Sequence, residues 1–127
     1  MTQRILIVED HPTMREALRL VLEREDLDIV EAGDGNAALA LARSEPPDLV
    51  LLDLHIPGMP GEEVLTKLKA DPTTSHARVI VVTATGEEGR ARALAVGADA
   101  YFTKPFSPTA LLRAVEQARG GPEPRGS

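Results

Sequence analysis

Short apolar runs recur along the chain, and each is followed by a stretch in which polar and apolar residues are mixed. Short runs rich in Val, Ile and Leu are typical of buried strands. Two of them, 48–53 and 78–84, show no polar alternation, so we expect them to be covered on both faces. The weaker run 27–32 carries Asp28 and Glu31, which suits the edge of a sheet. The pattern predicts strands at 4–10, 27–32, 48–53, 78–84 and 100–104.

The stretches between these runs have the spacing of amphipathic helices. In 12–25 the apolar residues fall at i, i+3, i+4, i+7 and i+8, which forms one stripe on a helix. These residues are Met14, Ala17, Leu18, Val21 and Leu22. Asp34 can cap the second helix, Gly97 can end the fourth, and Ser107 followed by Pro108 can begin the last. Helices are predicted at 12–25, 35–44, 61–70 and 87–96, and from 108 to about 119.

Strands and helices therefore alternate through the chain, which predicts a parallel sheet with helices on both faces. This α/β pattern favours a flavodoxin-like (βα)5 doubly wound sandwich, with a five-stranded parallel sheet in the order 2-1-3-4-5. Residues 1–119 would form this single domain, since no internal repeat is found. Residues 120–127, GGPEPRGS, have the composition of a flexible tail or linker.

Composition and charge exclude several classes of function. The chain has 127 residues, of which 43% are hydrophobic, and it has no cysteine for disulfides or thiolate metal sites. Its formal net charge of -6 argues against direct nucleic-acid binding, which requires clustered Lys and Arg. The first residues, MTQRILIVEDHP, contain no apolar run suited to a signal peptide or a membrane span. We therefore expect a cytoplasmic protein without membrane insertion.

Polar residues interrupt the apolar runs where the predicted strands end. Glu9 and Asp10 follow the first strand, and Asp53, Thr83 and Lys104 end the third, fourth and fifth. In open α/β sheets, ligands bind at the carboxyl ends of the strands, where the strand order reverses. Three carboxylates there would repel one another by roughly 4 kcal/mol per pair, at about 4 Å and an effective dielectric of about 20. Lys104 offsets part of this repulsion, and a hard divalent cation such as Mg²⁺ would offset the rest.

These side chains include the parts needed to accept a phosphoryl group. A carboxylate such as Asp53 can act as the nucleophile. A metal ion and Lys104 can neutralise the equatorial phosphoryl oxygens as negative charge spreads over them. Thr83 can donate a hydrogen bond to one of those oxygens. The sequence thus predicts Mg²⁺-assisted phosphoryl transfer to a strand-end aspartate.

Four segments together resemble the receiver domain of bacterial two-component response regulators, the chemotaxis-type receiver. Each segment alone is weakly specific, but the four in this order are highly specific, and the resemblance covers residues 4–119. It implies a phosphorelay signalling switch that assists its own phosphorylation and dephosphorylation and is not otherwise an enzyme. The segments are ILIVEDHP, DLVLLDLHIPGMPG, VIVVTA and ALAVGADAYFTKPF.

The resemblance assigns roles around the predicted acceptor. It implies that Asp53 becomes a 4-aspartylphosphate and that Glu9 and Asp10 hold Mg²⁺, with Asp10 as a direct ligand beside Asp53. The backbone carbonyl of His55 would also ligate the metal. His55 and Thr85 flank the phosphate site, and we expect them to influence the lifetime of the phosphoryl group.

The resemblance also implies a switch. Thr83 maps to the switch hydroxyl, Lys104 to the phosphate-binding lysine, and Tyr101 to an aromatic ring that rotates inward after phosphorylation. Lys104–Pro105 maps to a cis peptide bond, which X-Pro bonds can adopt. From sequence alone, Tyr101 could equally be a half-buried packing residue.

The implied partners are a sensor histidine kinase or phosphotransfer protein, which donates the phosphoryl group, and an output protein or domain, which responds to it. The output partner would dock on the surface of helix 87–96, strand 100–104 and the last helix, near Tyr101, Phe102 and Phe106. These three are the aromatic residues of the chain. A phosphorylation-dependent homodimer is a further possibility that the resemblance raises.

Two other functions compete with the switch. A Mg²⁺-dependent phosphohydrolase could form an aspartyl-phosphate at Asp53, but it needs a second acid two residues later, where His55 stands. An interaction module that takes no phosphoryl group is the third alternative, and the intact acidic set argues against it. His11 and His55 could form a transition-metal site with the acids or could face solvent.

Overall fold

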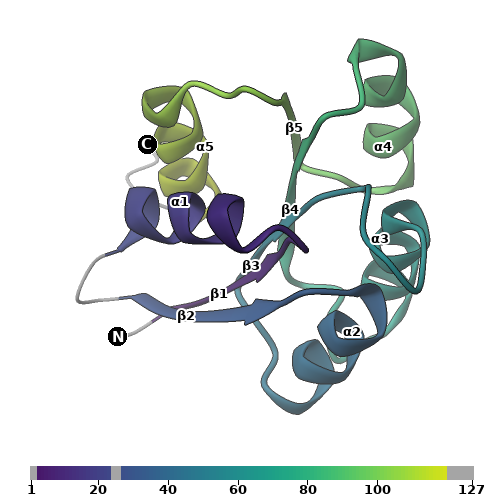
Figure 1. Ribbon diagram of the computed structural model, residues 1–127. Coiled ribbons are helices and arrows are strands. Elements are labelled where there is room, and N and C mark those ends of the chain that lie inside the picture. The colour runs from purple at the N-terminus through teal and green to yellow at the C-terminus, as the bar shows by residue number, and fades with distance from the viewer. Residues whose placement is uncertain (1–2, 24–26, 120–127) are drawn as a thin grey trace, which may run out of the picture.

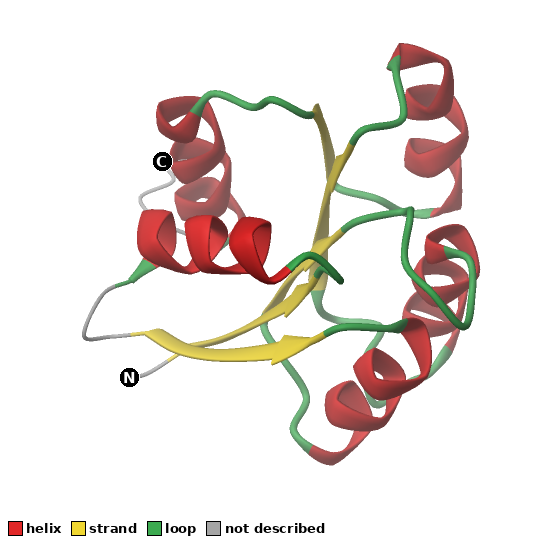
Figure 2. Ribbon diagram, in the orientation of Figure 1, coloured by secondary structure: helices red, strands yellow, loops and turns green. Residues whose placement is uncertain are grey.

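The computed structural model describes residues 3–23 and 27–119. A single sheet lies at its centre, with parallel strands in the order β2-β1-β3-β4-β5 (Figures 1 and 2). This order confirms the predicted flavodoxin-like (βα)5 fold. The strands are β1 (Gln3–Val8), β2 (Leu27–Ala32), β3 (Leu49–Leu52), β4 (Arg78–Thr83) and β5 (Ala100–Thr103).

Helices cover both faces of the sheet. Figure 1 shows α1 and α5 on one face and α2, α3 and α4 on the other. None of the helices in the described ranges is long and apolar enough to cross a membrane. The helices are α1 (Pro12–Leu22), α2 (Gly35–Ser44), α3 (Gly61–Ala70), α4 (Arg90–Val96) and α5 (Pro108–Ala118).

The core is divided by the sheet into two clusters, because successive strand residues point to opposite faces. Ile5, Leu49 and Ile80 belong to the cluster under α1 and α5. Leu6 and Val50 belong to the cluster under α2, α3 and α4. Both faces of the central strands are therefore buried, which explains why those strands carry no polar alternation in sequence.

Local capping signals in the sequence form as expected. The side chain of Asp34 accepts a hydrogen bond from the backbone N–H of Ala37 at 2.7 Å. Ser107 accepts one from the backbone N–H of Ala110 at 3.2 Å. Gly97 ends α4 with φ at 122°, in the region that favours glycine. These caps satisfy helix-end groups that would otherwise lack partners.

Several predicted boundaries differ from the structure. Strands β3, β4 and β5 are each one or two residues shorter than predicted. Strand β1 ends at Val8 and not at residue 10, because His11 and Pro12 already begin α1. The predicted helix 87–96 is a 3-10 turn, η1 (Glu87–Gly89), followed by the short α4. The glycine at its N-cap offers no capping side chain, which weakens the first turn. Helix α1 ends at Leu22, whereas the predicted positions 24–25 and the tail 120–127 lie outside the described residues.

Candidate functional site

The register of β1 and β3 brings two of the predicted acids to the same edge of the sheet. Val8 pairs with Leu52, so Glu9 and Asp53 are the next residue on each strand. The backbone N–H of Asp53 donates to the carbonyl of Val8 at 3.0 Å, which continues the ladder to the acid. The strand ends thus place both carboxylates without help from flexible loops.

Lys104 bridges the two carboxylates. Its Nζ lies 2.7 Å from Oε1 of Glu9 and 3.0 Å from Oδ2 of Asp53. The three side chains are 14%, 1% and 4% exposed, respectively. Burial alone would lower the pKa of Lys104, but its hydrogen bonds to Glu9 and Asp53 outweigh burial and raise that pKa. The ammonium group therefore stays charged between the two acids at neutral pH.

A backbone contact holds the position of Lys104. Its N–H donates to the carbonyl of Thr83 at 2.8 Å, so β4 fixes the point where the lysine leaves β5. The Lys104–Pro105 peptide bond that comes next is cis.

The loop after Asp53 orients its carboxylate. Oδ1 of Asp53 accepts a hydrogen bond from the backbone N–H of His55 at 3.0 Å. Gly61 packs so closely under this loop that a Cβ atom there would lie 2.4 Å from Cα of Leu54. The absence of a side chain at Gly61 therefore lets the start of α3 pack against the backbone that follows Asp53. Both oxygens of Asp53 have partners, one an ammonium group and one an amide.

Asp10 differs from the other two acids because one of its oxygens lacks a partner. Among the residues described, its buried Oδ1 forms no hydrogen bond. Nδ1 of His11 approaches that oxygen to 3.3 Å and also lies 3.3 Å from Oε2 of Glu9. A buried oxygen without a donor, next to other carboxylate oxygens, is consistent with a site for a hard divalent cation. The donor set therefore fits Mg²⁺.

The acids at the strand ends form two overlapping groups. Ligand atoms of Glu9, Asp10 and His11 lie within 4.8 Å of one another. Glu9 and Asp53 meet at Lys104, whose ammonium group contacts both carboxylates. His11 was predicted to be either a ligand or a solvent-facing residue, and its side chain is 76% exposed while Nδ1 faces the acids.

Thr83, the predicted switch hydroxyl, is fully buried at the end of β4. Its Oγ1 donates to Oγ1 of Thr85 at 3.4 Å and accepts from the backbone N–H of Thr85 at 3.3 Å. Nε2 of His55 is hydrogen-bonded to Oγ1 of Thr85. The bond joins the loops after β3 and β4, and no local pattern in the chain indicated it because the two residues are far apart in sequence.

Tyr101, predicted to be either an aromatic ring that rotates or a packing residue, lies inside the protein, and its rotation on phosphorylation stays a prediction. Its side chain is 3% exposed. The hydroxyl donates to the carbonyls of Thr85 at 3.1 Å and Gly86 at 2.9 Å. Burial raises the pKa of Tyr101, and the nearby charges of Glu88 and Glu87 raise it further. The two carbonyl acceptors explain why the ring is stable in this position without a phosphoryl group.

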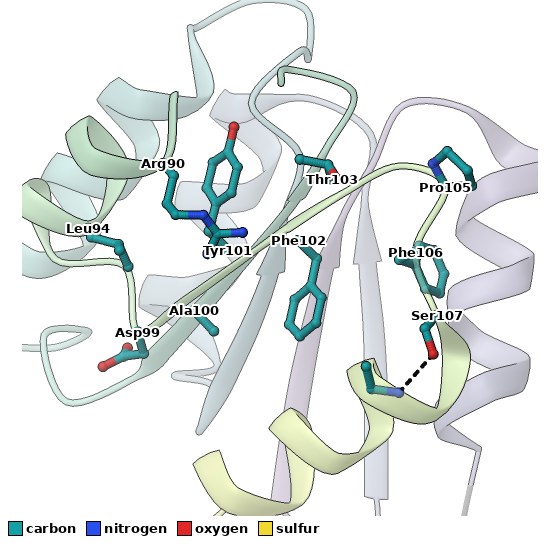
Figure 3. A pocket seen from close by; sticks show the side chains of 11 residues that line it. Arg90, Leu94, Asp99, Ala100, Tyr101, Phe102, Thr103, Pro105, Phe106 and Ser107 are labelled. Atoms are coloured by element: carbon teal, nitrogen blue, oxygen red, sulfur yellow. Dashed lines mark hydrogen bonds between the residues drawn. The ribbon is translucent and has the colours of Figure 1, made fainter. Parts of the chain in front are cut away.

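The aromatic residues surround a hollow of about 540 Å³ at the outer edge of β5 (Figure 3). Tyr101 packs with the cluster under α2, α3 and α4, whereas Phe102 and Phe106 pack with the cluster under α1 and α5. The hollow therefore joins both faces of the sheet at its edge.

Comparison with known proteins agrees with this fold and site. The sequence model of the response regulator receiver domain family matches residues 5–116 of this chain. The phosphate regulon transcriptional regulatory protein PhoB of Escherichia coli (strain K12) is 42% identical over 117 residues, which are 91% of this chain and 51% of PhoB. The chain thus spans about half the length of the curated relatives that it matches.

Two solved structures extend the comparison. The CheY-like response regulator receiver domain protein from Methanospirillum hungatei JF-1 has a TM-score of 0.86 at 30% identity, over 94% of this chain and 95% of that chain. The receiver domain of sensor histidine kinase PA1611 from Pseudomonas aeruginosa PAO1, solved with a magnesium ion coordinated in the active site cleft, has a TM-score of 0.84 at 25% identity. It covers 95% of this chain and all of that chain. This chain therefore belongs to the family of response regulator receiver domains.

Proposed function

We propose that the chain is a phosphorylation-dependent switch whose acceptor is Asp53. The observation that carries this proposal is the pairing of a buried aspartate with the ammonium group of Lys104 at the carboxyl edge of the sheet. The ammonium group and the backbone N–H of His55 hold the two oxygens of Asp53 in position, and a carboxylate oxygen is the nucleophile that attacks phosphorus. The same ammonium group is close enough to neutralise a phosphoryl oxygen bound to Asp53.

The transfer is an exchange of one bond for another. A carboxylate oxygen of Asp53 forms a bond to phosphorus, and the bond from phosphorus to the donor breaks. With a phosphohistidine donor, the electron pair of the broken bond returns to the imidazole nitrogen. With acetyl phosphate, acetate leaves. Lys104 stays protonated throughout and orients the incoming phosphoryl group.

Mg²⁺ is the cofactor that the oxygen-rich pocket favours, as in the related receiver domain that holds magnesium in its cleft. Asp10 would be the principal ligand because its Oδ1 lacks a partner among the described residues. Asp53, Glu9 and the backbone carbonyl of His55 would complete the oxygen set. When bound, the ion would neutralise charge on the transferring phosphoryl group. Glu9 already accepts from Lys104 at 2.7 Å, which is consistent with a role through water.

The donor would be a sensor histidine kinase, a phosphotransfer protein or a small phosphodonor. The output would be a protein or domain that docks beside β5, near Tyr101, Phe102 and Phe106, or a second copy of the chain. Residues 1–119 would form the phosphoacceptor domain, and 120–127 would serve as a tail or as a linker to an output domain. A cytoplasmic location is typical of the family, and we propose it here.

The phosphohydrolase alternative is not favoured by any observation at the site. The position two residues after the acceptor carries His55 in place of the carboxylic acid that such an enzyme needs, and its ring is hydrogen-bonded to Thr85. The relatives found by sequence are regulators and not classical enzymes.

Intact mass measurement tests the acceptor. The native chain, incubated with acetyl phosphate and Mg²⁺, should gain one phosphoryl group, and Asp53→Asn should gain none. Asp48→Asn is the matched control, because Asp48 bonds the backbone N–H of Arg4 at the opposite end of the sheet, and it should behave like the native chain. A phosphoryl group that persists in Asp53→Asn would remove the assignment.

A further inference from the structure

The hydroxyl of Tyr101 occupies a seat built by the loop between β4 and α4. Two carbonyl oxygens, of Thr85 and Gly86, accept hydrogen bonds from it. Gly89 forms the wall beside the hydroxyl, because a Cβ atom at Gly89 would lie 2.8 Å from the phenol oxygen. A side chain of any size at position 89 would therefore collide with the seated ring.

Arg90 closes this seat. Its guanidinium carbon lies 5.1 Å from the centroid of the Tyr101 ring, and Figure 3 shows the two side chains next to each other. Glu87 holds the guanidinium group through two hydrogen bonds, from Nε at 2.6 Å and from Nη2 at 3.0 Å. This two-bond geometry fixes the plane of the guanidinium, so the cation stays near the face of the ring.

The seat also positions the start of α4. This helix has seven residues, no side-chain cap at Gly89, and Ala93 as its buried side chain. The hydrogen bonds from Tyr101 to the loop before it, together with the contact to Arg90, therefore join β5 to the first turn of the helix.

We propose that Gly89 and the Glu87–Arg90 pair form a preformed seat that holds Tyr101 inside before Asp53 is phosphorylated. Arg90 and Gly89 are positioning residues, because they act on the ring and not on the phosphoryl group. The loop already favours the inward position of the ring, and phosphorylation favours it further. The loop sequence therefore sets the activity of the output surface before phosphorylation. The link to output rests on the proposed function, but the seat itself can be measured in the unphosphorylated chain.

Acrylamide quenching of tyrosine emission tests the seat, because the chain has one tyrosine and no tryptophan. A neutral quencher is needed, since the net charge of -6 would repel an anion such as iodide. The native chain should be weakly quenched, and Gly89→Ala should show a severalfold larger quenching constant. Gly33→Ala is the control, since Gly33 follows β2 at the opposite edge of the sheet from β5, and a Cβ there meets the end of the Arg15 side chain at 3.2 Å. Equal quenching of the native chain and Gly89→Ala, or of both glycine variants, would overturn the seat.

A second pair of variants tests the contact between Arg90 and the Tyr101 ring without adding bulk to the seat. Arg90→Met should raise the quenching constant about twofold, and Arg92→Met should leave it unchanged, since Arg92 pairs with Glu62 at 3.6 Å. The pKa of the Tyr101 phenol, raised in the native chain, should fall toward the ordinary value in Gly89→Ala as the ring gains water. A phenol pKa unchanged in Gly89→Ala would contradict the proposal even if the helix were perturbed.

Two measurements together separate this proposal from the proposed function. If Gly89→Ala and the native chain both gain one phosphoryl group while only the variant exposes its tyrosine, both proposals stand. If neither gains a phosphoryl group but the quenching difference remains, the seat stands and the acceptor assignment fails. If the native tyrosine is as accessible as in Gly89→Ala, the seat fails whatever the mass shows.

Discussion

The acceptor pocket and the Tyr101 seat are both buried and polar, but they are built from different interactions. In the pocket, the charged Lys104 satisfies Glu9 and Asp53 from strand ends with fixed register. In the seat, a neutral hydroxyl donates to two carbonyls of a loop, beside a short helix. Breaking a buried ion pair costs about 3–5 kcal/mol, whereas a neutral hydrogen bond contributes about 1 kcal/mol. Because the ion pairs of the pocket are more costly to break than the hydrogen bonds of the seat, we expect the pocket to be rigid and the seat to be the region that can move.

Thr85 connects the two regions. Its side chain meets Thr83 and His55 at the pocket, and its carbonyl accepts from Tyr101 in the seat. Thr85 is therefore the residue through which a change in the position of Thr83 would reach the seat. Substitutions in each region can show whether the pocket is rigid, whether the seat is adjustable, and whether Thr85 joins them.

The largest effect should come from removing the central cation. Lys104→Met leaves Glu9 and Asp53 buried without a partner and should lower the free energy of unfolding by about 3 kcal/mol, measured by urea denaturation at neutral pH. Lys67→Met is the control, because Lys67 is 45% exposed and its contact with Glu63 is 3.9 Å long. A loss for Lys104→Met no larger than for Lys67→Met would mean that the pocket is not the rigid region.

Comparing the native chain with Lys104→Met also gives a pH test. The pKa of Lys104 is raised in the folded chain, so its contribution is fully present below the unfolded value of 10.5 and is lost as pH rises through the folded value. The native chain should therefore lose stability above about pH 10.5. Lys104→Met should lose less over the same range. Identical slopes for the two proteins would contradict the raised pKa.

Next in size is the effect of Asp10→Asn on phosphorylation. The variant keeps the shape of the side chain but removes the charge, and Mg²⁺ affinity should fall roughly 10- to 100-fold or more. Phosphorylation by acetyl phosphate should then be lost, while stability should rise slightly because like charges no longer repel. Isothermal titration with Mg²⁺ and intact mass measure the two effects. Normal Mg²⁺-dependent phosphorylation of Asp10→Asn would exclude Asp10 as a ligand.

A smaller effect is expected at the junction of the two regions. Beryllofluoride with Mg²⁺, a stable phosphoryl mimic, should change the emission of Tyr101 in the native chain, and the change should shrink in Thr83→Ala. Charge-assisted hydrogen bonds of about 1.5–3 kcal/mol are large enough to bias such an equilibrium. Thr66→Ala on the exposed side of α3 is the control. The same response in the native chain and in Thr83→Ala would show that pocket and seat are not coupled through this hydroxyl.

The smallest effect concerns the bond between His55 and Thr85 beside the acceptor. His55→Ala removes this hydrogen bond, worth about 1 kcal/mol, and Thr85→Ala also removes the acceptor of the Thr83 hydroxyl. Either change opens a path for water toward the phosphoryl group. The half-life of the aspartyl-phosphate should change about fivefold, and the phosphorylation rate should change less. Mass spectrometry over time gives both rates. Equal half-lives in the native chain and both variants would leave this bond without a role in phosphoryl lifetime.

Much of this protein is readable from sequence because the signals are local. Apolar runs, helical spacing and caps such as Asp34 and Ser107 predicted the alternation of strands and helices. Polar residues that end apolar runs identified Glu9, Asp53 and Lys104, because parallel strands bring their carboxyl ends to one edge. The resemblance to receivers then supplied the roles that local patterns cannot.

Contacts between distant residues decided the rest. Lys104 meets Glu9 and Asp53 across 95 and 51 positions of the chain, so only the fold brings these three charged groups together. Tyr101 likewise meets the carbonyls of Thr85 and Gly86, and lies beside Gly89, only because the fold brings β5 next to the loop after β4. Rotamers and hydrogen-bond partners depend on which neighbours share the space, and that is known only when the tertiary fold has brought those neighbours together.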